Sequence, residues 1–233
     1  MNVPLEFTID VILRKVCDQK LVNTDIPKKD MKKLLLLCTK HVHFGFDNKL
    51  YQQLDGVAMG SPLGPVIADI FMVELETTIV PTLSNCLLFW QRYVGDTLCF
   101  VKKGFRDHIL TSINNFHPNI DFTYEGEINN MLSFLDALLI CQSNGTIDRA
   151  IFRKQINSGF FINWNAFAPE NLKIGTLKLL LHRAYRVSNK SYLLQMELDY
   201  LEDTFMSINN YPESLINKIM KQVNDEQVRN LQQ

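Results

Sequence analysis

The chain has 233 residues, of which 46% are hydrophobic and 21% charged, so it can bury a sizeable core and is not intrinsically disordered. Its formal net charge of -1 excludes the general basic excess of proteins that bind phosphate backbones over much of their surface. Its five cysteines form no CxxC pair, and no apolar run is long and uncharged enough to cross a membrane. These features predict an intracellular protein, nuclear or cytoplasmic, without a membrane partner.

Hydrophobic spacing predicts two helices near the start of the chain, from Glu6 to Gln19 and from Lys28 to His41. A β-hairpin is expected around Asp47-Asn48, because apolar residues flank this turn pair on both sides. A loop rich in glycine and proline follows from Gly56 to Pro65, and it leads into a helix that reaches about Thr78.

The middle of the chain mixes short strands with one helix. The pattern predicts two strands joined through Gly95-Asp96 and a second pair joined across Asn144-Gly145, a strong signal for a two-residue hairpin. The expected elements are strands Leu87 to Arg92 and Thr97 to Val101, a helix Arg106 to Phe116, a strand Asp121 to Glu125, and strands Ser133 to Cys141 and Thr146 to Arg153.

Only helices are predicted after about Ser158. Apolar residues step by three and four along three segments, and Pro169 and Pro212 lie where two of the helices can begin. We therefore expect an α+β fold in which an antiparallel sheet with packed helices, residues 1–157, is followed by an all-helical region, residues 158–233.

The most specific sequence feature is a fifteen-residue string, Tyr51-Gln-Gln-Leu-Asp-Gly-Val-Ala-Met-Gly-Ser-Pro-Leu-Gly-Pro65. Gly56 and Gly60 allow the backbone to approach a base or a sugar closely, and Ser61-Pro62 can open the helix behind such a site. A tight loop before a helix would also explain these glycines and prolines, but it would not explain the whole fifteen-residue string.

Two later segments complete the pattern. The first reads Arg92-Tyr-Val-Gly-Asp-Thr97, and the second runs from Phe134-Leu-Asp136 through a hairpin to Ile151-Phe-Arg-Lys154. Taken alone, the first is an ordinary hairpin turn and the second an amphipathic hairpin with a solvated end.

In this order and at these distances, the three segments resemble palm motifs B, C and D to E of the Penelope-like retroelement reverse transcriptases, which are RNA-directed DNA polymerases. The resemblance implies a partial reverse-transcriptase palm followed by a helical thumb or helix-turn-helix-like region. It also implies a loop that contacts the nucleotide and template and a primer grip made of one aromatic ring and two cations. The loop residues implied are Gln53, Gly56, Met59, Gly60, Ser61 and Pro62, and the primer-grip residues are Phe152, Arg153 and Lys154.

The same resemblance predicts that polymerase chemistry is lost. The family reads YVDD where this chain reads YVGD, so Gly95 replaces the aspartate that binds Mg²⁺. Asp96 is the one catalytic, metal-binding residue of motif C that the resemblance leaves in this chain. Neighbouring strand residues point to opposite faces, so Asp96 cannot simply replace the missing aspartate as a metal ligand. The chain is also expected to begin just after motif A, whose aspartate binds both metal ions. We therefore expect a truncated pseudoenzyme that does not bind Mg²⁺ productively.

Other readings stay open. Residues 149–190 hold eight Lys or Arg and one acidic residue, so the chain could be a non-enzymatic protein that binds nucleic acid through this segment. A further alternative is that the chain is an incomplete gene model of an active element. The aromatic residues Phe160, Phe161, Trp164 and Phe167 beside it could stack on bases or belong to a core. An RNA template or DNA primer is the expected partner, and an uncovered edge of the palm sheet could also allow self-association.

Overall fold

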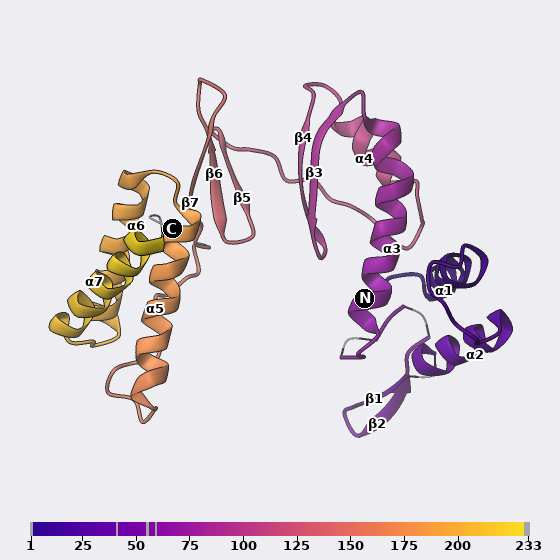
Figure 1. The fold of residues 1–233 in the computed structure, drawn as a ribbon, viewed down its shortest axis with the longest axis horizontal. Coiled ribbons are helices and arrows are strands. Elements are labelled where there is room, and N and C mark those ends of the chain that lie inside the picture. The colour runs from indigo at the N-terminus through magenta and orange to yellow at the C-terminus, as the bar shows by residue number, and fades with distance from the viewer. Residues whose placement is uncertain (1, 41, 55, 59, 231–233) are drawn as a thin grey trace. The chain divides into compact units, whose positions relative to one another are not determined.

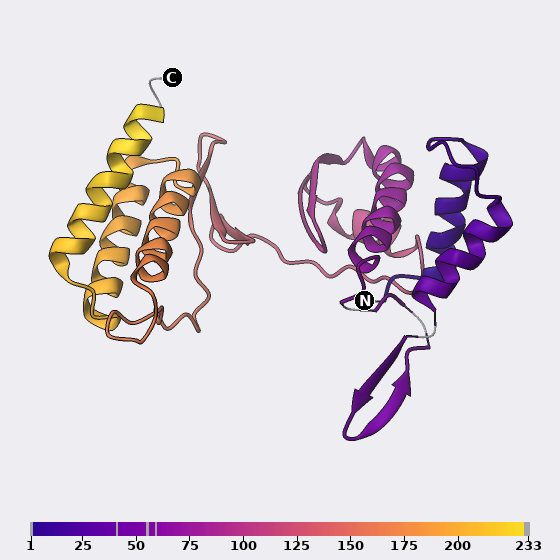
Figure 2. The ribbon, with the colours of Figure 1, turned by 60° about the horizontal axis from the view of Figure 1, so that its bottom comes forward.

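The computed structural model describes residues 2–40, 42–54, 56–58 and 60–230. The chain forms two compact units, Met1–Tyr124 and Glu125–Gln233, and each has a hydrophobic core of its own. The elements are shown as ribbons in Figures 1 and 2. The structure confirms an α+β fold with a helical C-terminal region.

The first unit combines helices with two hairpins. Helix α1 continues into a π-helical turn, η1, and α3 continues into a 3₁₀ turn, η2. Its elements are α1 Leu5–Leu13, η1 Arg14–Asp18, α2 Lys28–Thr39, β1 His43–Phe46, β2 Lys49–Gln52, α3 Gly64–Ile79, η2 Val80–Leu83, β3 Leu87–Tyr93, β4 Asp96–Val101 and α4 Arg106–Asn114.

The core of the first unit lies along α3. Ile67, Phe71 and Leu75 follow one another at intervals of four residues, and all three are fully buried, as their spacing predicted. Ile9 of α1 and Ile113 of α4 belong to the same buried cluster. Thus α3 is the central helix against which the rest of this unit packs.

The second unit is a three-stranded antiparallel sheet with a bundle of helices. Strand β6 lies between β5 and β7, and β7 contacts both α5 and α6. Its elements are β5 Met131–Phe134, β6 Ala137–Cys141, β7 Ile147–Ile151, α5 Glu170–Val187, α6 Ser191–Asp203, the π-helical turn η3 Thr204–Ile208 and α7 Glu213–Asn230.

The compact units divide the chain at a different place from the predicted boundary between residues 157 and 158. The physical reason is that the sheet β5 to β7 packs on the C-terminal helices, so it belongs to their unit. The assignment of residues 1–157 to a palm domain remains a prediction.

Two predicted strands differ in the structure. Residues 121–125 form no strand, because the side-chain amide of Asn114 bonds the backbone of Phe122 through both its oxygen and its nitrogen. The predicted strand Ser133 to Cys141 is two strands, since Leu135 adopts φ 56° and the chain reverses there. The turn between β6 and β7 consists of residues 143–145 instead of the predicted Asn144-Gly145 pair, because Gln142, and not Ser143, donates its backbone N–H to the oxygen of Thr146 at 2.8 Å.

Two further structural findings bear on the predicted partners. Within the described residues, β3 and β4 pair only with each other, so each strand has an outer edge without a strand partner. Self-association through such an edge remains a prediction. In the described part of the chain, none of the helices combines the length and the apolar character that crossing a membrane requires.

Candidate nucleic-acid interface

The loop between β2 and α3 carries the residues predicted to contact a nucleotide. Gly56 and Gly60 have φ values of 78° and 89°, which only glycine adopts without strain. Gln53 and Gly56 line a cavity of about 420 Å³ in the first unit. Gly60 is exposed and lies outside that cavity lining.

The start of α3 is the next part of this predicted site. Helix α3 begins at Gly64 with Pro65 in its first turn, three residues later than the predicted opening at Ser61-Pro62. The reason is that Ser61 and Pro62 form a preceding turn, in which the backbone oxygen of Ser61 accepts a hydrogen bond from Gly64 at 3.0 Å. Among the described residues, Ser61 and Pro62 do not line the cavity, and Met59 lies outside the described residues.

The hairpin β3–β4 carries the predicted remnant of a metal site. Its turn lies at Val94-Gly95, one residue earlier than predicted, so Asp96 is the first residue of β4 and faces Tyr93 across the hairpin. Val94 has φ 56°, which is strained for a β-branched residue. Gly95 lies outside the left-handed region, and a Cβ added to it would meet no atom within 4 Å. The backbone therefore does not require glycine at this position.

Arg92 fixes this hairpin to α3. Its Nε lies 2.7 Å from Oε1 of Glu76, and its Nη2 lies 2.9 Å from Oδ1 of Asp69. The hydrogen bond to Glu76 is the main reason that the pKa of Arg92 is raised, although partial burial opposes the charge. Trp90 donates from Nε1 to the same Glu76 oxygen at 2.9 Å.

The described residues do not fit a magnesium centre. No three His, Cys, Asp or Glu side chains in the described ranges lie close enough together to hold a metal ion. A pair of Mg²⁺ ions needs several carboxylate oxygens, and Asp96 supplies only one side chain. No chemical step can be derived through Mg²⁺ from these residues.

The predicted primer-grip residues follow β7 in the second unit. Arg153 forms an ion pair with the buried Glu197 and lies 3.7 Å from the ring centre of Tyr200. Lys154 is exposed, and no side-chain partner of it is found among the described residues. Phe152 is half-buried, and its backbone nitrogen donates to the oxygen of Asp136 at 2.9 Å. Arg153 therefore serves the fold of this unit, whereas Lys154 is accessible to a ligand.

The eight cations of residues 149–190 do not form one continuous basic surface. Lys173 is buried and donates to the backbone oxygen of Trp164 at 2.6 Å. Besides Arg153, two more are paired with carboxylates, Arg183 with Asp136 at 2.7 Å and Lys190 with Asp148 at 3.6 Å. Apart from the buried Lys173, four have no ion pair within the described residues: Arg149, Lys154, Lys178 and Arg186.

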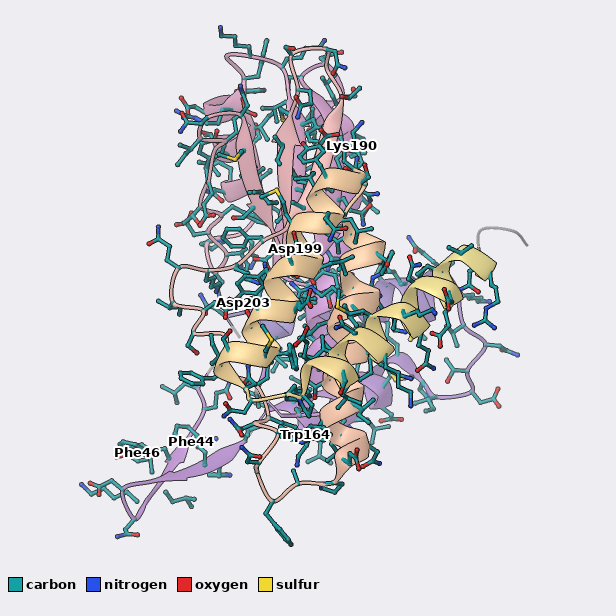
Figure 3. All side chains as sticks on the ribbon, turned by 90° about the vertical axis from the view of Figure 1, so that its left-hand side faces the viewer. Phe44, Phe46, Trp164, Lys190, Asp199 and Asp203 are labelled. Carbon is teal, nitrogen blue, oxygen red and sulfur yellow. The ribbon has the colours of Figure 1, made fainter. Side chains whose placement is uncertain are left out.

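The aromatic residues that precede α5 divide between core and surface. Phe161 stacks on Phe205 at 5.1 Å, and Trp164 packs against Tyr211 at 5.2 Å, so both belong to the helical core. Phe160 and Phe167 are exposed. Figure 3 labels Trp164 close to the lower end of the bundle.

One exposed face of α7 combines cations with hydrogen-bonding side chains. We call it the α7 face, and its residues follow the helical spacing i, i+3, i+4 and i+7. All four side chains are exposed and form no hydrogen bond or ion pair with another described residue: Ser214, Asn217, Lys218 and Lys221. The opposite face of α7 carries Ile216, Ile219 and Val223, which are buried in the bundle. Sequence reasoning missed this face, although the alternation of polar and buried residues along 213–223 could have revealed it.

The exposed side of α6 has the opposite charge. Asp199 and Asp203, labelled in Figure 3, are exposed, and Glu202 is half-exposed. A phosphate backbone would be repelled by these carboxylates. Of these two helices, α7 is therefore the better placed to approach a nucleic acid.

Comparison with known proteins adds one finding. Residues 160–221 match the family model described as "Animal helix-turn-helix domain". The match includes α5, α6 and the N-terminal half of α7, and it confirms the helix-turn-helix-like region predicted from the sequence. No curated protein and no solved structure matches the chain, and the resemblance to reverse transcriptases stays a prediction.

Proposed function

We propose that this chain binds nucleic acid through its C-terminal helices. The observation that carries the proposal is that the helix-turn-helix match over residues 160–221 includes the α7 face at its C-terminal end. We take α6 and α7 as the two helices of the motif, so that α7 is the second helix, which in such domains enters the major groove and contacts base edges through its N-terminal residues. Lys218 and Lys221 would contact phosphates, and Ser214 and Asn217 would face base edges or sugars.

We further propose that the chain derives from a Penelope-like retroelement and has no polymerase activity. The fifteen-residue string that ends at Pro65, followed by a helix and the YVGD hairpin, supports this origin. Gly95 supports the inactivity, because by the resemblance it replaces a metal-binding aspartate, and the backbone at this position leaves room for a Cβ. A nucleic-acid ligand would place the protein in the nucleus or the cytoplasm.

A primer-extension assay tests the proposed inactivity. Purified protein supplied with RNA template, DNA primer, nucleotides and Mg²⁺ should give no extension, because a nucleotidyl transfer that depends on two metal ions fails without their ligands. Asp96→Asn should give the same null result. Robust extension that is abolished in Asp96→Asn would show that the remaining carboxylate suffices, and the proposed inactivity would be wrong.

Salt dependence of duplex binding tests the α7 face. We expect Lys218→Gln/Lys221→Gln to weaken binding to a duplex DNA of mixed sequence, because two phosphate contacts are lost. In fluorescence anisotropy at several salt concentrations, the slope of log K against log salt should become less steep by about two. An RNA–DNA hybrid measured in parallel shows which duplex is preferred.

The matched control is Lys102→Gln/Lys103→Gln in the first unit. It removes the same charge from two exposed lysines between β4 and α4. This control should leave both affinity and slope close to those of the unchanged protein. If both double variants weaken binding equally, only net charge matters and the α7 face is not the interface.

A further inference from the structure

The hairpin β1–β2 is the most exposed element of the first unit. Its strands pair from His43 with Gln52 to Phe46 with Lys49, and every residue of both strands is exposed. Asp47 and Asn48 both have positive φ, as a tight two-residue turn requires. Figure 2 shows the hairpin extending away from the helices of its own unit.

The two faces of this hairpin differ in chemistry. Side chains alternate along a strand and cross-strand partners share a face, so one face carries Phe44, Phe46, Lys49 and Tyr51. We call it the aromatic face. The other face carries His43, Gly45, Leu50 and Gln52. Three of the four side chains on the aromatic face are therefore rings, and the fourth is a cation.

The rings on the aromatic face are close together and accessible. Phe44 and Tyr51 stack with ring centres 5.6 Å apart and planes 18° apart, and Phe46 lies 6.5 Å from Tyr51. Phe44 is 51% exposed and Phe46 70% exposed. Figure 3 labels both phenylalanines on the projecting hairpin. A contiguous exposed aromatic patch on a two-stranded hairpin, which is marginally stable alone, indicates a surface that binds a partner.

The two ends of the hairpin line the 420 Å³ cavity described above. Thr39 and Lys40 precede β1, Gln53 and Leu54 follow β2, and all four belong to the cavity wall. The volume lies within the range of about 300–1,000 Å³ that small-molecule pockets have. The polar part of the wall includes Glu6, Lys40, Gln53, His117 and Asn119. A ligand resting on the hairpin can thus continue into a polar cavity of suitable size.

We propose that the aromatic face is a stacking platform for the unpaired bases of a single-stranded nucleic acid, whose strand would lead from the hairpin toward the cavity that holds the predicted nucleotide-contact residues Gln53 and Gly56. Rings that stack on bases without regard to sequence, together with a cation for the backbone, are what such ligands require. Lys49 provides the cation on the platform, whereas Lys40 in the cavity wall is paired with Glu6 at 3.2 Å. The inference shares with the proposed function only the class of ligand, since it concerns a different unit and unpaired strands.

The side-chain distribution favours this ligand over a lipid surface or a second copy of the chain. The branched aliphatic residue of the strands, Leu50, lies on the opposite face from the rings and beside His43 and Gln52. Planar rings with a lysine among them match the faces of bases and a phosphate. Binding to a lipid surface and self-association are therefore the two alternatives that the experiment must distinguish from binding to a single strand.

Binding of a labelled oligothymidylate of about twelve nucleotides to the full chain tests the platform. Phe44→Leu/Phe46→Leu keeps apolar side chains but removes two rings, so we expect single-strand binding to weaken about tenfold or more while duplex binding is unchanged. The matched control is Leu50→Ala on the opposite face, which should bind both ligands normally. Lys218→Gln/Lys221→Gln should show the converse pattern, so the two proposals can fail separately.

A second variant tests the platform if Phe44→Leu/Phe46→Leu misfolds. Phe46→Trp should bind the oligothymidylate at least as tightly, and emission of the new indole should be quenched by stacked bases, relative to the unchanged protein with its Trp90 and Trp164. The proposal is overturned if ring removal leaves single-strand affinity unchanged, or if the new indole is not quenched at saturation. The proposal is also overturned if ring removal abolishes flotation with lipid vesicles, or abolishes dimerisation, while the affinity for oligothymidylate is retained. The first result would indicate a lipid-binding face and the second a self-association face.

Discussion

Asn209 is a single buried residue that joins three segments of the helical unit. Its side-chain nitrogen donates to the backbone oxygens of Gly159 and Thr204, both at 2.9 Å, and its side-chain oxygen accepts from Phe161 at 2.8 Å. Its own backbone oxygen accepts from Trp164 at 2.8 Å. The segment before α5 is therefore held to the end of α6 by one amide.

We predict that Asn209→Ala strongly destabilises the helical unit. The change removes the side-chain partner of two buried carbonyls and of one partly buried N–H, and a buried unsatisfied group costs about 1–3 kcal/mol. The free energy of unfolding of this unit should fall by at least about 3 kcal/mol. Urea unfolding followed by hydrogen exchange of α5 to α7 amides measures it without interference from the first unit.

Asn217→Ala is the control for this prediction, since it removes the same amide from an exposed position on α7. It should change the free energy of unfolding by less than about 0.5 kcal/mol. Equal effects of the two substitutions would show that the hydrogen bonds of Asn209 do not hold the unit together. The partners of Asn209 lie up to 50 residues away in sequence, which is why no local pattern could have predicted its role.

At the scale of elements, those with a strong local signal were predicted well. The helices α1 to α7 follow from apolar spacing, and the turn at Asp47-Asn48 follows from two residues that tolerate positive φ. These signals lie within a few residues, so neighbouring side chains alone determine them.

Elements whose residues carry no recognisable local signal were predicted poorly. The expected strand near Phe122 is absent because Asn114, eight residues earlier, takes both backbone groups of Phe122. The reversal at Leu135 was also missed, because a leucine with positive φ carries no turn signal. The exposed rings of β1–β2 were read only as strand residues, because alternation cannot show that both faces of a hairpin lie in solvent.

Ion pairs also connect elements that apolar spacing predicts only one at a time. Arg14 and Lys15 of η1 both contact Glu74 of α3, the latter at 3.2 Å. Desolvation by burial opposes the charge of Glu74, yet hydrogen bonds from these two residues outweigh it and lower its pKa. The π-helical turn that ends α1 is thereby fixed to the central helix of its unit.

At the scale of the whole molecule, three ion pairs connect the sheet β5 to β7 to the helices matched by the helix-turn-helix family. Arg153 of the strand end pairs with Glu197, Asp136 pairs with Arg183, and Asp148 pairs with Lys190. Glu197 and Asp148 are both buried, at 7% and 5% exposure. The sequence-predicted boundary at residues 157 and 158 would separate all three pairs.

We therefore predict that a fragment of residues 125–233 is more stable than a fragment of residues 158–233, although both contain the whole helix-turn-helix match. In the shorter fragment the surface of α5 and α6 that β7 covers becomes exposed, and Glu197, Arg183 and Lys190 all lose their partners in the sheet. Thermal unfolding followed by circular dichroism should show a lower midpoint for the shorter fragment.

Glu197→Gln distinguishes the ion pair from a general effect of truncation. In the longer fragment this neutral substitution should destabilise, because Arg153 then lacks its carboxylate, whereas in the shorter fragment it should have little effect, because Arg153 is absent. If both fragments melt at the same temperature and respond alike to Glu197→Gln, the sheet contributes nothing to the helices. The boundary of the helical unit would then lie after residue 157, as predicted from the sequence.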